Sequence, residues 1–148
     1  MYKRFFVSVI LLVCFLSLFG KARELTPYLA DPDTNTGIAV IICPGGSYSW
    51  LDMKTEGVIP AKWLQSNGIN AFVLKYRVAS VGAYILGFRA LGIGHKYPDM
   101  LNDVEWALEV IYTNADKYNV DTAKIGVMGF SAGGHLAMLS YLHNKTSY

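Results

Sequence analysis

Residues 124–137 read KIGVMGFSAGGHLA, and this stretch decides the fold. An apolar segment leads directly into the pattern Gly-x-Ser-x-Gly centred on Ser131, and a segment rich in Ala and Leu follows it. A strand, a tight turn and a helix in this order are what a nucleophile elbow requires. The positions two before and two after the serine have no room for side chains there, and Gly129 and Gly133 occupy them. The stretch therefore predicts Ser131 as a nucleophile; the alternative is an ordinary glycine-rich turn between a strand and a helix.

A second glycine-rich turn, Pro44-Gly45-Gly46-Ser47-Tyr48, follows the apolar run at residues 38–43. An oxygen that becomes negative during acyl transfer needs backbone amides aimed at it, with no side chain in the way. Gly45 and Gly46 meet that need, and the amide of Ala132 follows the nucleophile at the start of a helix. We predict these three amides as oxyanion donors, with a plain tight turn as the alternative for the two glycines.

Strands and helices are expected to alternate along the chain. Periodicity predicts strands at 25–29, 38–43, 70–76 and 124–128, and helices at 56–67, at 98–119 and from 132 onward. This order favours an α/β fold with a mostly parallel sheet and helices on both faces. Asp99 and Asp103 are expected at the start and on the solvent side of the helix at 98–119. Residues 78–96 are expected to form a folded connection or a flap over the substrate.

The first 22 residues are typical of a secretory signal. Lys3 and Arg4 precede the apolar run at 5–19, and small residues follow at 20 and 22. We predict a signal peptide at 1–22, an exported domain at 23–148 and no membrane contact after cleavage; an uncleaved anchor is the alternative. Three of the thirteen Lys and Arg lie in the signal, which leaves the mature chain a net charge of about −1. That charge gives no indication of nucleic-acid binding.

Cysteine and metal chemistry are not expected to contribute. Cys14 lies within the predicted signal, so Cys43 would be alone in the mature chain and could form no intrachain disulfide. Its place at the end of an apolar strand indicates a small buried hydrophobic residue. No metal or cofactor is predicted.

Three motifs carry a family resemblance: Cys-Pro-Gly-Gly-Ser-Tyr at 43–48, Phe-Val-Leu-Lys-Tyr-Arg at 72–77 and the elbow at 124–137. In order and spacing they resemble the α/β-hydrolase esterases that deacylate plant polysaccharides, the acetyl and feruloyl esterases, a branch close to the lipases. The resemblance spans about residues 25–143. It implies the N-terminal half of an α/β-hydrolase fold and a serine carboxylesterase acting on acyl groups borne by sugars or polysaccharides. It also implies Ser131 as nucleophile, and Gly45, Gly46 and Ala132 as oxyanion donors.

The chain departs from that family after the elbow. The resemblance implies a triad Asp and His on loops after two further strands, and no Asp or Glu follows Ser131. His135 is expected to be a packed histidine beside the nucleophile, and His95 and His143 are poor candidates for a base. We therefore expect an incomplete or inactive esterase that can self-associate through an unpaired sheet edge. The alternatives are an exported binding module without catalysis and a peptidase of the same fold.

Overall fold

A computed structural model describes residues 23–79 and 97–146. The predicted signal at 1–22 and most of the predicted flap at 78–96 lie outside the described residues. The described chain forms a sheet of four strands: β1 (Glu24–Tyr28), β2 (Ala39–Cys43), β3 (Asn70–Lys75) and β4 (Ile125–Gly129). Their spatial order is β1-β3-β2-β4, and only β1 runs antiparallel to its neighbour. The predicted α/β fold with a mostly parallel sheet is confirmed.

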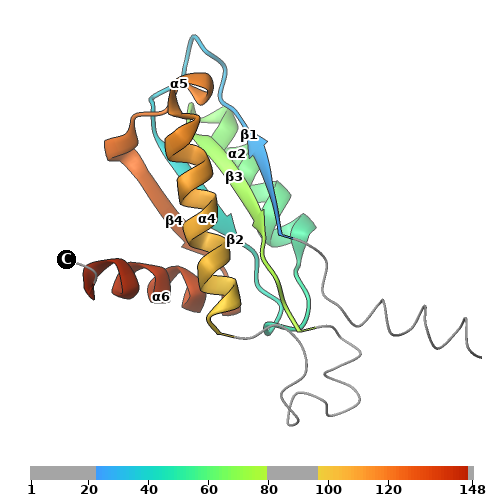
Figure 1. Ribbon diagram of the computed structural model, residues 1–148. Coiled ribbons are helices and arrows are strands. Elements are labelled where there is room, and N and C mark those ends of the chain that lie inside the picture. The colour runs from blue at the N-terminus through green and yellow to red at the C-terminus, as the bar shows by residue number, and fades with distance from the viewer. Residues whose placement is uncertain (1–22, 80–96, 147–148) are drawn as a thin grey trace, which may run out of the picture.

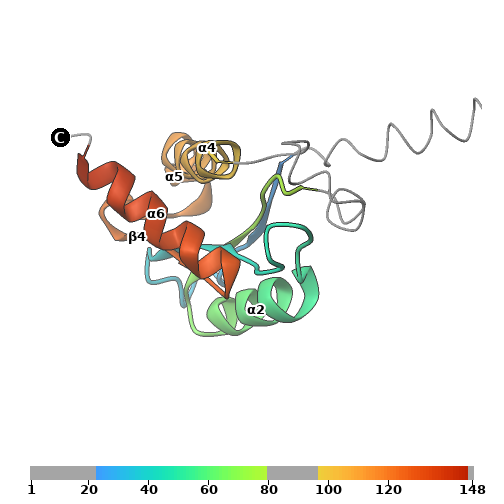
Figure 2. The same ribbon diagram turned by 90° about the horizontal axis from the view of Figure 1, so that it is seen from below.

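Helices cover both faces of this sheet (Figures 1 and 2). A π-helical segment η1 (Met53–Val58) continues into α2 (Ile59–Ser66) on one face, and α4 (Asp99–Thr113) lies on the other. The last helix, α6 (Ala132–Thr146), contacts β4, β2 and α4. Successive side chains of β2 point to opposite faces of the sheet and so contribute to the apolar core on each face. Ile41 packs on the α4 side and Ile42 on the α2 side. A strand covered by helices on both faces has to be apolar along its covered length, as β2 is throughout and β3 is from residue 71 to residue 74.

The helix predicted at 98–119 is interrupted at Asn114. There α4 ends, and a short helix α5 (Ala115–Tyr118) follows. The Asn114 side chain donates to the carbonyl of Val110 at 2.8 Å, and this local hydrogen bond competes with continuation of the helix. A short 3-10 turn, η2 (Thr122–Lys124), then leads into β4. Periodicity alone could not locate this break, because the apolar stripe continues across it.

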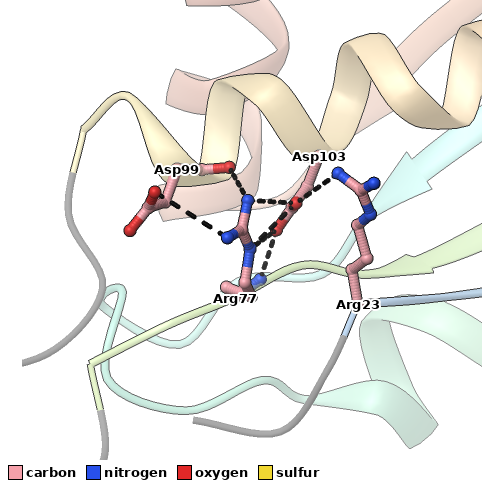
Figure 3. Close-up of polar contacts among 4 residues, drawn as sticks. All are labelled: Arg23, Arg77, Asp99 and Asp103. Atoms are coloured by element: carbon pink, nitrogen blue, oxygen red, sulfur yellow. Dashed lines mark hydrogen bonds and ion pairs between the residues drawn. The ribbon is translucent and has the colours of Figure 1, made fainter. Parts of the chain in front are cut away.

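Asp103 is fully buried, so the expectation that it faces solvent is wrong. Its carboxylate accepts from Arg77 Nε at 3.0 Å, from Arg77 Nη2 at 2.8 Å and from the Arg77 amide at 2.8 Å (Figure 3). Arg23 approaches the same carboxylate at 3.4 Å. The hydrogen bond to Asp103 raises the pKa of Arg77 above its ordinary value. This network ties α4 to the start of β1 and to the end of β3.

Strand β4 forms one edge of the sheet within the described part of the chain. Gly126, the second residue of β4, is exposed, and nothing lies within 4 Å of the position that a Cβ would take there. The neighbouring helix α6 exposes Met138, Tyr141 and Leu142. Unpaired edges beside apolar surface favour association, and the predicted self-association stays a prediction. Among the described residues, no helix has the length and hydropathy that a membrane span requires.

Cys43 is a buried residue of the core at the end of β2. Burial raises the pKa of its thiol to about 12. The thiol is therefore protonated at physiological pH, and reactive cysteines need the opposite shift. The prediction that Cys43 is a small buried hydrophobic residue agrees with this position.

Candidate active site

Ser131 lies at the turn between β4 and α6, where the backbone reverses sharply. Its φ is +49°, in the left-handed region, and its side chain is exposed. A non-glycine residue in that region costs about 1–3 kcal/mol and is held there by its surroundings. The Gly133 amide donates to the Phe130 carbonyl at 2.7 Å, and the His135 amide donates to the Ser131 carbonyl at 3.1 Å. These bonds hold Ser131 in the strained geometry of a nucleophile elbow.

The two elbow glycines are required by the approach of β2. A Cβ added to Gly133 would lie 1.9 Å from the Cys43 carbonyl oxygen, and one added to Gly129 would lie 2.3 Å from the Gly133 carbonyl carbon. These contacts are to backbone atoms, which have little freedom to move aside. The start of α6 and the ends of β4 and β2 therefore pack so closely that positions 129 and 133 have no room for a side chain.

Gly133→Ala and Gly126→Ala form a matched pair that tests this packing. We expect Gly133→Ala to lower the free energy of unfolding by about 2–3 kcal/mol, because the new methyl group overlaps backbone. Gly126 lies on β4, the strand that leads into the elbow, where a Cβ would meet no other atom. Gly126→Ala should therefore be neutral or raise the free energy of unfolding by up to about 1 kcal/mol. Urea denaturation followed by circular dichroism compares the two. Equal stability of the two variants would contradict the close approach of β2.

The turn after β2 lies against Ser131. A Cβ placed on Gly45 would be 3.1 Å from the Ser131 Cβ. The next three residues all have positive φ: Gly46 at +139°, Ser47 at +54° and Tyr48 at +57°. The Gly46 carbonyl closes the turn by accepting from the amides of Ser49 at 2.9 Å and Trp50 at 3.1 Å. Two glycine-rich turns that are far apart in the sequence therefore meet at Ser131.

The backbone amides of this turn are not equivalent. The Gly45 amide donates to the Glu56 carboxylate, with 2.7 Å between N and Oε2. Within the described residues, the amides of Gly46, Ser47 and Ala132 donate to no protein group. Of the donors predicted from sequence, Gly46 and Ala132 are therefore available for an oxyanion, whereas the single proton of the Gly45 amide is already engaged. The roles of Gly45, Gly46 and Ala132 as oxyanion donors stay predictions.

His135 is held by Tyr48 across the two turns. Its Nδ1 lies 2.7 Å from the Tyr48 hydroxyl, and the two rings meet edge to face. The ring of Tyr48 also meets Tyr76, whose hydroxyl donates to the Pro44 carbonyl at 2.7 Å. Burial raises the pKa of Tyr76, which keeps that hydroxyl protonated as a donor. His135 is exposed, and its contact with Tyr48 joins α6 to the glycine-rich turn. The expectation that it is a packed histidine without a catalytic role stays a prediction.

The other histidines lie elsewhere. His143, on α6, is 3.3 Å from the Glu105 carboxylate, measured between Nε2 and Oε1. His95 lies outside the described residues. Glu56 was given no site role in the sequence analysis, because it reaches Gly45 only through the path of the chain between them. Tyr48 and Tyr76 lie in the motifs at 43–48 and 72–77, but their contacts with His135 and Pro44 join segments that are distant in the chain.

The sheet, the elbow and the facing turn define an α/β hydrolase. A family model described as BD-FAE matches residues 28–148, and the chain belongs to the BD-FAE family of α/β hydrolases. The acetylxylan esterase of Xylanibacter ruminicola is 30% identical over an alignment that covers 93% of this chain and 28% of that protein. The endo-1,4-beta-xylanase B of Butyrivibrio fibrisolvens is 36% identical, covering 80% of this chain and 17% of that protein.

Solved structures show the same fold. An acetyl ester-xyloside bifunctional hydrolase from Caldicellulosiruptor lactoaceticus superposes with a TM-score of 0.63 at 37% identity, covering 80% of this chain and 38% of that one. MGS-M1, an alpha/beta hydrolase from a Medee basin deep-sea metagenome library, gives a TM-score of 0.61 at 32% identity. The match covers 78% of this chain and 44% of that one. The chain therefore spans less than half the length of each of these relatives.

Proposed function

We propose that this chain carries the nucleophile of a serine carboxylesterase that removes acetyl or feruloyl groups from carbohydrates. The observation that carries the proposal is the geometry at Ser131. An exposed serine in a strained elbow lies against a turn whose Gly46 and Ser47 amides have no protein acceptor within the described residues. Acyl transfer needs these two parts together: a nucleophilic oxygen, and amide donors for the oxygen that becomes negative.

In the proposed reaction, Ser131 Oγ attacks the carbonyl carbon of the ester. The carbonyl oxygen becomes negative in the tetrahedral intermediate and is stabilised by the amides of Ala132 and Gly46. The proton of Ser131 Oγ passes through solvent to the sugar oxygen, and collapse of the intermediate breaks the bond between the carbonyl carbon and that oxygen, which leaves as the sugar hydroxyl. Water then attacks the acyl-serine, releases the acid and returns a proton to Oγ. Positive φ at Ser131 exposes Oγ for the attack, and the helix α6 that begins at Ala132 favours negative charge at its N-terminus.

Proton transfer limits the rate that we expect from this chain. A serine hydroxyl is a weak nucleophile without a base. Within the described residues, His135 is engaged by Tyr48, and no carboxylate bonds to its ring. We therefore propose slow turnover by the 148-residue chain, sustained by the oxyanion donors, which alone leave a rate above that of water.

The substrate class is supported by the names of the relatives. One is an acetylxylan esterase, and one of the solved structures is an acetyl ester-xyloside bifunctional hydrolase. Both names combine an acetyl ester with a xylose-based carbohydrate. For this chain we propose acyl esters of polysaccharides, with acetylated xylan as the first substrate to test.

A substrate panel tests the proposal. The purified chain is incubated with acetylated xylan, feruloylated arabinoxylan, p-nitrophenyl acetate and a peptide p-nitroanilide, and each product is quantified. We expect slow release of acetate above the buffer rate and no cleavage of the amide. Cleavage of the amide in place of the esters would favour a peptidase. No hydrolysis of any substrate would favour a binding module built on the hydrolase scaffold.

A further inference from the structure

Glu56 reaches the glycine-rich turn because η1 begins directly after it. The Asp52 amide donates to the Gly45 carbonyl at 3.0 Å, and the Asp52 carboxylate caps the segment by accepting from the Thr55 amide at 3.0 Å. Gly57 packs η1 onto β3, since a Cβ there would lie 2.9 Å from Val73 Cγ1. The segment is thus held both to the turn and to the sheet, with Glu56 between these anchors.

The Glu56 carboxylate lies where the turn and the nucleophile meet. Its Oε2 accepts from the Gly45 amide at 2.7 Å, a length typical of a charge-assisted hydrogen bond. A Cβ on Gly45 would lie 2.6 Å from this oxygen and 3.1 Å from the Ser131 Cβ. The carboxylate and the serine therefore approach the same glycine.

The turn needs such an anchor. Gly46, Ser47 and Tyr48 have positive φ in succession, and strained backbone persists only where contacts around it impose it. Both peptide groups of Gly45 are engaged. The Glu56 carboxylate accepts from its N–H, and the Asp52 amide, just before η1, donates to its carbonyl. The residue before the strained run is thereby fixed relative to Ser131.

We propose that Glu56 is a positioning residue for the oxyanion turn. Its carboxylate accepts the hydrogen bond of the Gly45 amide and thereby fixes the orientation of the amides that follow. The amides of Gly46, Ser47 and Ala132 then remain free to donate to the oxyanion. The inference rests on the proposed esterase chemistry for its catalytic consequence. The hydrogen bond between the Gly45 amide and Glu56 does not depend on esterase activity, and it is tested by a separate measurement.

Three variants of the full chain isolate the role of the carboxylate. Glu56→Ala removes the acceptor, and Glu56→Gln keeps an acceptor oxygen while it removes the charge. Lys54→Ala changes an exposed charged residue of the same segment, whose side chain has no hydrogen bond or ion pair with the turn among the described residues. Circular dichroism melting curves establish that each variant is folded.

Two readouts are compared. The first is the state of the Gly45 amide, measured by nuclear magnetic resonance as its proton and nitrogen chemical shifts and its hydrogen-exchange rate. The second is the second-order rate of Ser131 labelling by a fluorophosphonate. We expect Glu56→Ala to move the Gly45 proton upfield, to speed its exchange and to slow labelling by about tenfold or more. Glu56→Gln should recover most of the labelling rate, and Lys54→Ala should match the unsubstituted chain.

An unchanged Gly45 amide in Glu56→Ala would overturn the proposal. So would a folded Glu56→Gln variant that labels as slowly as Glu56→Ala. If Ser131 of the unsubstituted chain does not label at all, the esterase proposal fails, and the Gly45 amide signal still decides whether Glu56 holds the turn.

Discussion

Replacing Ser131 with alanine is expected to abolish labelling by a fluorophosphonate and to lower the slow ester hydrolysis of the chain toward the buffer rate. The probe forms a covalent bond with serine Oγ, and Ser131→Ala removes that oxygen, so neither the probe adduct nor an acyl-serine can form. Ser131 is exposed, and its backbone bonds do not involve Oγ, so the variant should retain the fold. Intact-mass spectrometry measures the adduct, and peptide mapping locates it.

The matched control is Ser66→Ala. Ser66 is exposed at the end of α2, and its hydroxyl donates to the Trp63 carbonyl, away from the glycine-rich turns. This variant should label at the rate of the unsubstituted chain. An adduct on a serine other than 131, or full labelling of Ser131→Ala, would remove Ser131 from the proposed mechanism.

Asp103→Ala should have the largest effect on stability, lowering the free energy of unfolding by about 3–5 kcal/mol. Removing one partner of a buried ion pair leaves the other charge without compensation. Asp103 is fully buried and accepts hydrogen bonds from three N–H groups of Arg77: the amide, Nε, which is shared between both carboxylate oxygens, and Nη2. The variant would leave the amide and Nε of Arg77 without this acceptor, while Nη2 keeps the Asp99 carbonyl at 3.1 Å. The attachment of the end of β3 to α4 would be weakened.

Urea denaturation measures the loss, with Glu109→Ala as control because Glu109 is an exposed carboxylate on the same helix. The control should stay within about 0.5 kcal/mol of the unsubstituted chain. The double variant Arg77→Met/Asp103→Leu should be more stable than Asp103→Ala, since it removes both charges together. A loss below about 1 kcal/mol in Asp103→Ala would show that the network contributes little.

The elements nearest the nucleophile could be predicted from local patterns. An apolar strand, Gly-x-Ser-x-Gly and a helix-forming segment are contiguous, so neighbouring residues alone specify the strand, the turn and the helix around Ser131. The doubly apolar strands β2 and β3 likewise indicated a sheet with helices on both faces. The break at Asn114 was missed, because it depends on one side-chain hydrogen bond and leaves the apolar stripe unchanged.

What the sequence by itself determined is thus the alternation of strands and helices, the elbow at Ser131 and the glycine-rich turn that faces it. The tertiary structure alone decided which polar groups meet. Asp103 is 26 residues from Arg77, Tyr48 is 87 residues from His135, and Glu56 reaches Gly45 across the start of η1. Periodicity places a residue on a face of its own helix, but a buried charge is stable only beside a partner. That partner is brought by the packing of distant segments, which no local pattern contains.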